Sequence, residues 1–419
     1  MNRRIIIICP SFPPNPGIGG RRWAKFAKIL FQRGYDVWVF AFKLPNIETE
    51  SHWTNDVEAL QKAGRIIQVE RNYPEVLDDY PTGILQKIKY RFWENYLKFR
   101  YKGNIYDRSL RWNKELIPEI QKLIIQNNTT IIATGAPFSY LTDLVELKEG
   151  NSLKLCADLR DPWSNNKIAY NKGLSRERIA QEKEKEKLVI KYYDVVFSVY
   201  KEIIEFQKQE FNEVNAIHVH LPNGFDKSES KKSLYTKENS KINFVFAGTL
   251  YEDAEYIFKE FVEYLDQLKL KDPKRYKMLQ FEFYGDILPN NLRHFKNHTK
   301  VLILKKTLPL VQMLNRIALS DFSMVFLTDF MNYTLNTKFL EGVNQGNKVL
   351  VFSSPGYLTN FAEQHNIGYS MTKQEMAESF EKCFNDWETG KHKINKTPQD
   401  FLKYDVERLT DVIIGNTVS

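Results

Sequence analysis

The feature that most constrains the fold is a regular alternation of short apolar runs with longer amphipathic stretches. The apolar run Ile5–Cys9 predicts a buried strand, and Trp23–Gln32 carries apolar residues at helical spacing with lysines on its other face. Gly34 ends this predicted helix, and Val37–Phe42 predicts the next strand. Strands that alternate with helices indicate a parallel sheet covered on both faces.

The alternation occurs twice along the chain. The first series continues with predicted strands at Ile66–Val69, Thr130–Ala133, Leu153–Ala157 and Val195–Val199, and the second has them at Phe244–Ala247, Phe281–Tyr284, Val301–Leu304, Phe322–Leu327 and Val349–Phe352. Between the two series, Leu221–Lys241 is polar and highly charged, which is typical of a linker. A chain of 419 residues is also longer than one core usually grows. We therefore predict two α/β domains, residues 1–225 and 242–395, with a linker at 226–241 and a final helix within 396–419.

Composition narrows the class of protein and the partners. The hydrophobic content of 42% is that of a packed globular protein, and no apolar run approaches the ~20 residues that span a bilayer. The run Ile5–Ile8 is too short for a signal peptide, and the three cysteines have no pairing or metal-ligand spacing, so we expect a cytoplasmic protein. The net charge of +8 favours anionic partners. Phosphates and an acidic membrane surface are more consistent with the sequence than nucleic acid, because no RNA- or DNA-binding module is recognised.

A glycine-rich turn joins the first predicted strand to the first helix. In "PSFPPNPGIGGRR", Gly17, Gly19 and Gly20 let the backbone approach a ligand, and Arg21 and Arg22 add charge at a helix N-terminus that suits an anion. The stretch lacks the third glycine of a dinucleotide-binding GxGxxG motif. The alternative is a tight turn with solvated arginines, which would give the same sequence pattern.

A charged segment, "CADLRDPWSNN", follows another buried strand. Asp158 and Asp161 flank Arg160, and two carboxylates beside an arginine could orient a sugar hydroxyl or handle a proton. The alternative is a structural ion-pair turn with Trp163 packed beneath it.

Two strands of the second series end in glycine followed by a polar residue. These ends are Gly248–Thr249 in "VFAGTLY" and Gly285–Asp286 in "FEFYGD". In doubly wound sheets ligands bind outside the carboxyl ends of the strands. Either end could also be a plain strand-to-helix turn.

The stretch "NYTLNTKFLEGVNQGNKVLVF" predicts a helix capped by Asn336 or Thr337. A helix N-terminus with Lys338 suits a diphosphate, and Glu341, about one turn further, could accept hydrogen bonds from ribose hydroxyls. A surface helix with an i,i+3 Lys–Glu pair would give the same pattern.

The segment Lys87–Lys102 combines basic and aromatic residues. Lys87, Lys89 and Arg91 accompany a helical stripe that contains Ile88, Phe92, Tyr96 and Phe99. A basic amphipathic helix with aromatics is typical of a membrane surface element. The alternative is a helix whose stripe packs on the first domain. A second charged run, Glu182–Lys187, alternates in sign and predicts a solvated helix face.

Taken together, these motifs resemble the GT-B glycosyltransferases, specifically the large family four of retaining nucleotide-sugar enzymes. The resemblance spans nearly the whole chain and rests on the order of "PSFPPNPGIGG", "ADLRDPW", "LPNGFD", "FAGTLY", "TKFLEGVNQGNKVLVF" and "NIGYS". It implies two Rossmann-like doubly wound domains that face each other across a cleft. The donor would bind the C-terminal domain and the acceptor the N-terminal domain, and the final helix would cross back to the first domain.

The resemblance also implies roles for single residues. Gly19 and Gly20 would approach the donor diphosphate or the sugar, Gly248 and Thr249 would line the nucleotide site, and Glu341 would match the second glutamate of an E-x7-E motif. Thr337 and Lys338 would sit near the diphosphate, and Lys305, Lys306 or Lys338 would replace the Arg/Lys pair that usually clamps it.

The sequence departs from the family at two further positions. The first glutamate of the E-x7-E motif is replaced by Tyr333, and the N-domain histidine often found near the reaction centre is absent from the matching "ATGAPFSY". These departures match a divergent branch that carries the D-x-R-D-P-W segment.

The resulting expectation is a glycosyltransferase that moves a sugar from a nucleoside diphosphate sugar and uses no cofactor. We also expect it to be metal-independent, because no D-x-D motif occurs where a metal would serve. Asp158, Arg160 and Asp161 are the candidate catalytic residues. Arg21, Arg22, Lys87, Lys89 and Arg91 are expected to face the acceptor or a membrane. A polyprenyl-diphosphate-linked saccharide at the inner face of the plasma membrane, in capsule, O-antigen or exopolysaccharide assembly, would be the natural acceptor. Two alternatives stay open: a GT-B epimerase or phosphorylase, and an inactive binding subunit of an assembly complex.

Overall fold

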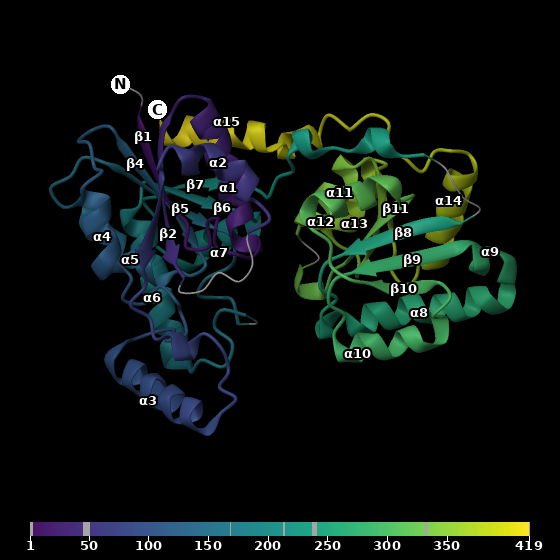
Figure 1. Cartoon of the computed structure of the whole chain (residues 1–419), viewed down its shortest axis with the longest axis horizontal. Coiled ribbons are helices and arrows are strands. Elements are labelled where there is room, and N and C mark those ends of the chain that lie inside the picture. The colour runs from purple at the N-terminus through teal and green to yellow at the C-terminus, as the bar shows by residue number, and fades with distance from the viewer. Residues whose placement is uncertain are drawn as a thin grey trace. The chain divides into compact units, whose positions relative to one another are not determined.

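The chain forms two compact units in a computed structural model (Figure 1). The first comprises residues 1–222 with 409–419, and the second comprises residues 223–408. The structure describes residues 3–44, 51–167, 169–212, 214–236, 241–331 and 334–418. Part of the predicted linker, residues 237–240, and the predicted motif position Tyr333 lie outside these described residues.

The first unit is built on a seven-stranded parallel sheet with strand order β3-β2-β1-β4-β5-β6-β7. Its strands are β1 (Arg4–Ile8), β2 (Asp36–Lys43), β3 (Ile66–Glu70), β4 (Thr129–Gly135), β5 (Lys154–Leu159), β6 (Val195–Ser198) and β7 (Ile217–His220). Its helices are α1 (Arg21–Gln32), α2 (Thr54–Lys62), α3 (Ile84–Arg100), α4 (Asn113–Gln121), α5 (Ser139–Asp143), α6 (Arg176–Tyr192) and α7 (Lys201–Glu210).

The second unit repeats the plan with a six-stranded parallel sheet of order β10-β9-β8-β11-β12-β13. Its strands are β8 (Ile242–Ala247), β9 (Leu279–Tyr284), β10 (Leu302–Lys305), β11 (Phe322–Phe326), β12 (Lys348–Phe352) and β13 (Gly368–Ser370). Its helices are α8 (Glu255–Lys271), α9 (Pro273–Met278), α10 (Pro289–Leu292), α11 (Leu310–Leu319), α12 (Thr337–Asn344), α13 (Tyr357–Gln364) and α14 (Met376–Glu388).

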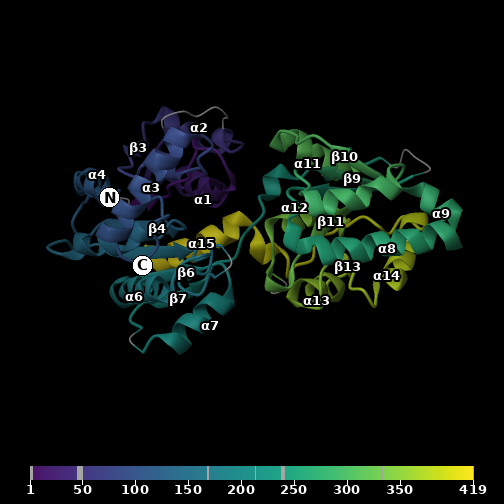
Figure 2. The ribbon, with the colours of Figure 1, turned by 90° about the horizontal axis from the view of Figure 1, so that it is seen from below.

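Helices cover both faces of the second sheet (Figure 2). Successive strand residues point to opposite faces. On β8, Phe244 and Phe246 join a core with α8 and α14, whereas Val245 packs with α11. On β12, Val349 and Val351 face α12 and α13 instead. Strands buried on both faces explain the continuous apolar runs in the sequence.

The parallel two-sheet architecture confirms the predicted fold class, and every predicted strand is present. Two strands were not predicted. β7 is a half-exposed edge strand with the mixed sequence Ile-His-Val-His, and β13 has three residues, so neither carries a long apolar run.

The last helix, α15 (Val406–Thr417), begins in the second unit and continues into the first. Within the first unit, its Asp411 pairs with Arg33 (Nη1–Oδ1 2.6 Å) and the carbonyl of Thr417 accepts a hydrogen bond from Thr130 Oγ1 (3.1 Å). The chain thus returns to the first sheet after completing the second.

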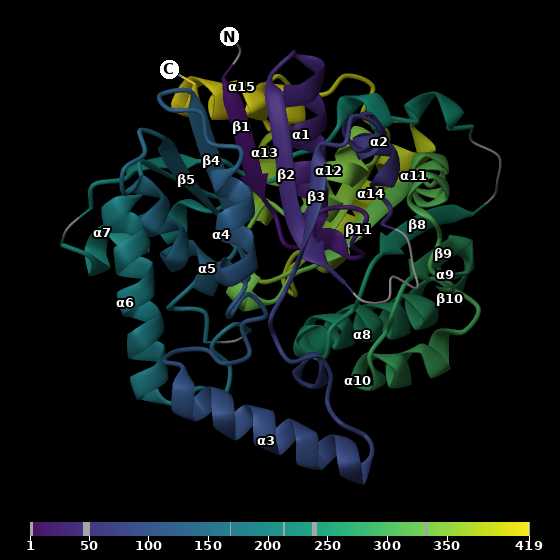
Figure 3. The same ribbon diagram turned by 60° about the vertical axis from the view of Figure 1, so that its left-hand side comes forward.

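Helix α3 stands apart from the sheet of the first unit (Figure 3). It packs on a small separate core that contains Tyr73, Leu77, Leu97, Ile105 and Leu110. No helix among the described residues is long and apolar enough to cross a membrane.

Candidate active site

In the second unit, two glycines follow the carboxyl ends of adjacent strands and pack against each other. Gly248 follows β8 with φ +131°, Gly285 follows β9 with φ +128°, and the Gly248 N–H donates to the Tyr284 carbonyl (2.8 Å). A Cβ on Gly285 would lie 2.4 Å from the Gly248 carbonyl oxygen. Only glycine fits this conformation and this close approach, so the loop backbones meet where the fold places a ligand.

Lys338 fills the space beside Gly248. A Cβ on Gly248 would lie 2.5 Å from Lys338 Cε and Nζ, and the ammonium lies over the ring of Phe246, 5.1 Å from its centroid. Burial lowers the pKa of Lys338, and the charge of Glu341 partly offsets this effect. A desolvated ammonium gains from an anion placed against it.

The helix that carries Lys338 begins as predicted. The Asn336 side chain caps α12 by accepting a hydrogen bond from the Phe339 N–H (2.8 Å), and Thr337 is the first helical residue. Gly342 lets the helix lie close to the sheet, because a Cβ there would be 3.0 Å from Ser323 Cβ and Val349 Cγ2. The N–H groups of the first turn thus start beside the strand ends.

The other predicted donor residues of the second unit lie on the same edge of its sheet, whereas Gly19 and Gly20 belong to the first unit. Lys305 ends β10 directly opposite Tyr284 of β9 and is exposed, and Thr249 is half-buried after Gly248. Glu341 lies about one turn into α12, close enough for its charge to raise the pKa of Lys338. Gly248, Thr249, Lys305, Thr337, Lys338 and Glu341 are therefore brought together by the topology, while their roles stay predictions.

In the first unit, Gly19 and Gly20 of the opening turn lie close against Ser11 of the same turn. A Cβ on Gly20 would lie 2.2 Å from the Ser11 carbonyl oxygen, and one on Gly19 would lie 2.6 Å from Ser11 Oγ. Gly20 is buried. The close approach that requires glycine is thus to the chain's own backbone at Gly20, while the neighbour of Gly19 is the Ser11 side chain.

Arg22 and Asp158 form a buried ion pair. Arg22 Nε and Nη2 each lie 3.1 Å from the Asp158 carboxylate, and Trp23 Nε1 donates to the same carboxylate (2.7 Å). Arg22 also donates to the carbonyls of Leu221 and Pro222 (2.6 Å each). Both side chains are buried and hold segments of the first unit together. The acceptor- or membrane-facing role of Arg22 and the catalytic role of Asp158 stay predictions. Arg21 is buried as well, so the tight turn does not have solvated arginines.

Arg160 holds three loop carbonyls together. Its Nε donates to Gly135 O (3.0 Å), Nη1 to Gly19 O (2.5 Å) and Nη2 to Ala136 O (2.6 Å). All three guanidinium nitrogens are engaged, so Arg160 positions the opening turn against the loop after β4. Asp161, the third predicted catalytic residue, is exposed. The pKa of Asp161 lies above its usual value, because the surrounding protein desolvates the carboxylate.

Trp163 is packed beneath this segment, as the structural alternative predicted. It also contacts the charged run of α6, Glu182–Lys187, for which a solvated face was predicted. Trp163 is buried and its Nε1 donates to Glu182 (2.7 Å), while the Ser164 N–H donates to Glu186 (3.0 Å). Both glutamates are buried. The prediction of a fully solvated face for Glu182–Lys187 is therefore wrong, because these carboxylates accept hydrogen bonds from the loop above them.

The apolar stripe of α3 does not pack on the first domain. Ile88, Phe92 and Phe99 are 61%, 64% and 91% exposed, whereas the buried side of the helix is formed by Trp93 and Leu97. Lys87, Lys89 and Arg91 are exposed as well. At about 100° per residue, Lys87 and Arg91 border the stripe on one side and Lys89 borders it on the other.

Sequence reasoning missed two residues that shape these sites. Phe246, which underlies Lys338, looked like an ordinary strand residue, and Ser11, which meets Gly19, is one serine in a loop. Neither has a signal in the sequence, because each acts through a contact with a residue far along the chain or across a turn.

Metal binding was predicted to be absent. Within the part of the chain that the structure describes, no group of three or more His, Cys, Asp or Glu residues could hold a metal ion. The metal independence of the site stays a prediction.

No protein-family model matches this sequence, and no curated protein matches it by sequence. Solved structures do match over almost their whole length. The sucrose-phosphate synthase of Thermosynechococcus elongatus has 11% identity and a TM-score of 0.60, covering 98% of this chain and 97% of its own. A UDP-forming alpha,alpha-trehalose-phosphate synthase from Burkholderia xenovorans has 12% identity and a TM-score of 0.61, covering 100% and 99%.

A third match is an E. coli structure described as trehalose-6-phosphate bound with UDP-2-fluoro glucose. It has 12% identity and a TM-score of 0.64, and the alignment covers 99% of this chain and 98% of that one. Each match covers both units, and each unit here has a parallel sheet with helices on its faces. The chain has the GT-B fold, with two Rossmann-like domains of seven and six parallel strands.

Proposed function

We propose that this protein is a glycosyltransferase that moves a sugar from a nucleoside diphosphate sugar to a saccharide or lipid-linked saccharide. The observation that carries the proposal is the desolvated ammonium of Lys338 at the start of α12, beside the glycine turns that follow β8 and β9. The fold supports it, since one structure with the same fold is bound with UDP-2-fluoro glucose.

In this proposal Lys338 and the first turn of α12 bind the diphosphate. Negative charge builds on the leaving diphosphate as the bond to the sugar breaks, and a preorganised ammonium with helix N–H groups stabilises that charge. Glu341 accepts hydrogen bonds from the ribose hydroxyls, and Lys305 adds positive charge at the same edge. Retention of the anomeric configuration and metal independence belong to the proposal.

The first unit supplies the acceptor side. Of the two predicted catalytic carboxylates, that of Asp161 belongs to the residue that reaches solvent. The surrounding protein partly desolvates it and raises its pKa, which suits a group that exchanges a proton. Asp158 and Arg160 act as positioning residues for the loops around it.

Isothermal titration with UDP, GDP, ADP, TDP and CMP, with and without magnesium, tests donor binding. We expect one diphosphate to bind without magnesium. Lys338→Gln and Glu341→Gln should each weaken it by about 1.5–3 kcal/mol, the range for hydrogen bonds to charged groups, and exposed Lys300→Gln should not. Absence of nucleotide binding would overturn the proposal.

Release of nucleotide from the bound donor, followed with candidate acceptors, then tests transfer. Binding without any turnover would favour the inactive binding subunit, for which Tyr333 in place of the first motif glutamate is the motivating observation.

We further propose that the acceptor is presented at an anionic membrane surface, as expected for a polyprenyl-diphosphate-linked saccharide in bacterial surface polysaccharide assembly. The exposed apolar stripe of α3 with basic residues on both borders supports this. Replacing Lys87, Lys89 and Arg91 with Ser should reduce binding to vesicles that contain phosphatidylglycerol. Wild-type protein that fails to bind such vesicles, or binds them independently of salt, would contradict the proposal.

A further inference from the structure

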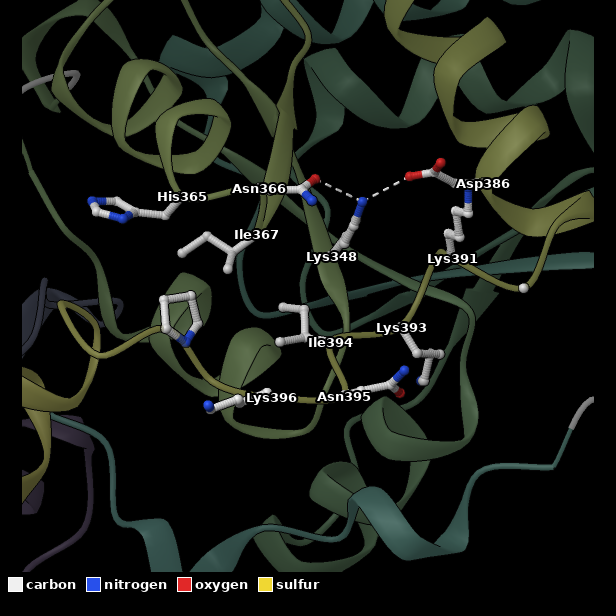
Figure 4. Close-up of a pocket in the computed structure, with 12 residues that line it drawn as sticks. Lys348, His365, Asn366, Ile367, Asp386, Lys391, Lys393, Ile394, Asn395 and Lys396 are labelled. Carbon is white, nitrogen blue, oxygen red and sulfur yellow. Dashed lines mark hydrogen bonds and ion pairs between the residues drawn. The ribbon is translucent and has the colours of Figure 1, made fainter.

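A cavity lies in the second unit, away from the candidate donor site. It has a volume of about 430 Å³, and its lining includes Lys348, Asp386, Lys391, Lys393 and Lys396 (Figure 4). Lys348 is the first residue of β12, so the cavity lies at the amino edge of the sheet. The candidate donor residues follow the carboxyl ends of the strands, at the opposite edge.

The lining carries a strong excess of positive charge. It contains four lysines and one carboxylate, Asp386. Lys348 is paired with Asp386, and burial lowers the pKa of Lys393 to about 7, so Lys391 and Lys396 carry most of the excess charge. The whole chain of 419 residues carries only +8. A large share of the molecule's net charge is thus concentrated around one small cavity, which favours an anionic ligand.

Two of the lysines are held in place by the fold. Lys348 Nζ donates to Asp386 Oδ2 (2.7 Å) and Asn366 Oδ1 (2.9 Å), and Figure 4 shows its side chain directed between them. Lys393 Nζ donates to the carbonyls of Ala318 (3.1 Å) and Ser320 (2.8 Å) and to Asn347 Oδ1. These fixed side chains form a preorganised wall of the cavity, which lowers the entropic cost of binding.

The other two lysines can reach a ligand. Lys391 and Lys396 are exposed and come from the segment that follows α14. The buried side chains of Ile367 and Ile394 contribute apolar lining between the charged groups. The cavity therefore combines fixed charge, adjustable charge and apolar surface.

We propose that this cavity binds a small phosphorylated molecule, independently of the donor site. Lysine ammonium groups are compact, hydrated point charges and are common phosphate binders. A volume of about 430 Å³ lies within the range of small-molecule sites, about 300–1,000 Å³, and accommodates a phosphate with one sugar ring. Lys391 and Lys396 contact the phosphate, and the apolar wall packs against the remainder of the ligand.

Isothermal titration of the full chain with inorganic phosphate and with glucose 6-phosphate tests the proposal. A saturating concentration of the nucleoside diphosphate that binds the donor site occupies that site, and sodium chloride keeps the ionic strength constant. We expect both phosphate and glucose 6-phosphate to bind, and we expect the double variant Lys391→Gln with Lys396→Gln to raise each Kd at least tenfold. The control replaces Lys274 and Lys277, two exposed lysines of α9 outside the cavity, with Gln, and should change Kd by less than twofold.

Equal binding by the wild type and the cavity variant, or equal weakening by the control, would overturn the proposal, because either shows binding by net charge alone. Tighter binding of glucose 6-phosphate than of phosphate assigns the site to a sugar phosphate, and equal binding assigns it to free phosphate. Since Lys391 and Lys396 are exposed, an unchanged melting temperature confirms that the variant is folded. If none of the five nucleotides binds but this site binds phosphate, the proposed function fails while this inference stands.

Discussion

At the scale of single residues, the first unit uses charged side chains in its interior to join segments that are distant in sequence. Arg22 links the start of α1 to Asp158 at the end of β5 and to the carbonyls of Leu221 and Pro222. Arg160 does the same for the opening turn and the loop after β4. Residues that look catalytic in the sequence thus shape the loops that would hold a substrate.

Asp158→Asn should lower the free energy of unfolding by about 3–5 kcal/mol, because it leaves the buried Arg22 guanidinium without its counter-charge. Asp36→Asn, which breaks the half-buried pairs with Arg4 and Arg65, is the control and should cost about 1 kcal/mol. Urea unfolding measures both. A stable Asp158→Asn protein that binds donor but transfers no sugar would instead make Asp158 catalytic.

At the scale of elements, α3 and α12 each have one side that packs on the protein and another part that carries the proposed function. The buried side of α3 holds it on a small core, while its apolar stripe is left exposed. The sheet side of α12 needs a glycine, while its N-terminus carries the candidate diphosphate site. The two sides of each helix can therefore be tested separately.

Phe92→Ser with Phe99→Ser should abolish binding to phosphatidylglycerol vesicles and leave the melting temperature unchanged, because both rings are exposed. Leu97→Ala, on the buried side of the same helix, should lower the free energy of unfolding by about 2–5 kcal/mol. Vesicle sedimentation and thermal unfolding distinguish the two variants. Vesicle binding that survives the loss of both rings would mean that α3 is not the membrane-binding element.

Gly342→Ala should destabilise the second unit by about 1–3 kcal/mol, since the new methyl group would press α12 away from Ser323 and Val349. The shift would also move Lys338 and weaken nucleotide binding. Gly415→Ala is the matched helical control in α15, where the added Cβ meets open space, and should stabilise the protein by about 0.5–1 kcal/mol. Similar effects of both substitutions on stability and nucleotide affinity would contradict this packing argument.

At the scale of the whole molecule, buried ionisable groups make stability depend on pH. Burial raises the pKa of Asp143 to about 7, and the charge of Lys185 only partly offsets this. The unfolded chain loses this proton near pH 4, so between about pH 4 and 7 the folded state binds more protons than the unfolded state. The contribution of Asp143 to stability is therefore present below about pH 4 and is lost as pH rises through about 7.

Asp143→Asn should raise the free energy of unfolding at pH 8 by up to about 4 kcal/mol and leave it unchanged near pH 4, because asparagine cannot ionise. Exposed Glu149→Gln is the control and should have little effect at either pH. Chemical unfolding at the two pH values checks the sign. A stabilising effect of Asp143→Asn that is equal at both would rule out this titration as the cause.

The fold could be predicted from the sequence because its signals are local. Apolar runs such as Ile5–Ile8 and Val349–Phe352 are buried on both faces of a sheet, and the alternation with helices determines that the sheets are parallel. The Asn336 cap of α12 was predicted for the same reason, since the cap and its N–H partner lie three residues apart.

The tertiary structure decided which charged residues form contacts inside the protein. The sequence does not indicate that Arg22 pairs with Asp158, or that Trp163 donates a hydrogen bond to Glu182. It also does not indicate that Lys338 lies beside Gly248. Each of these contacts joins residues that are distant along the chain. It also decided that the stripe of α3 faces outward and that Lys348 and Lys393 share a cavity with Lys391 and Lys396. The sequence by itself determined the two parallel sheets, since periodicity depends on neighbours in the chain. The site chemistry required the fold, since burial and partners depend on neighbours in space.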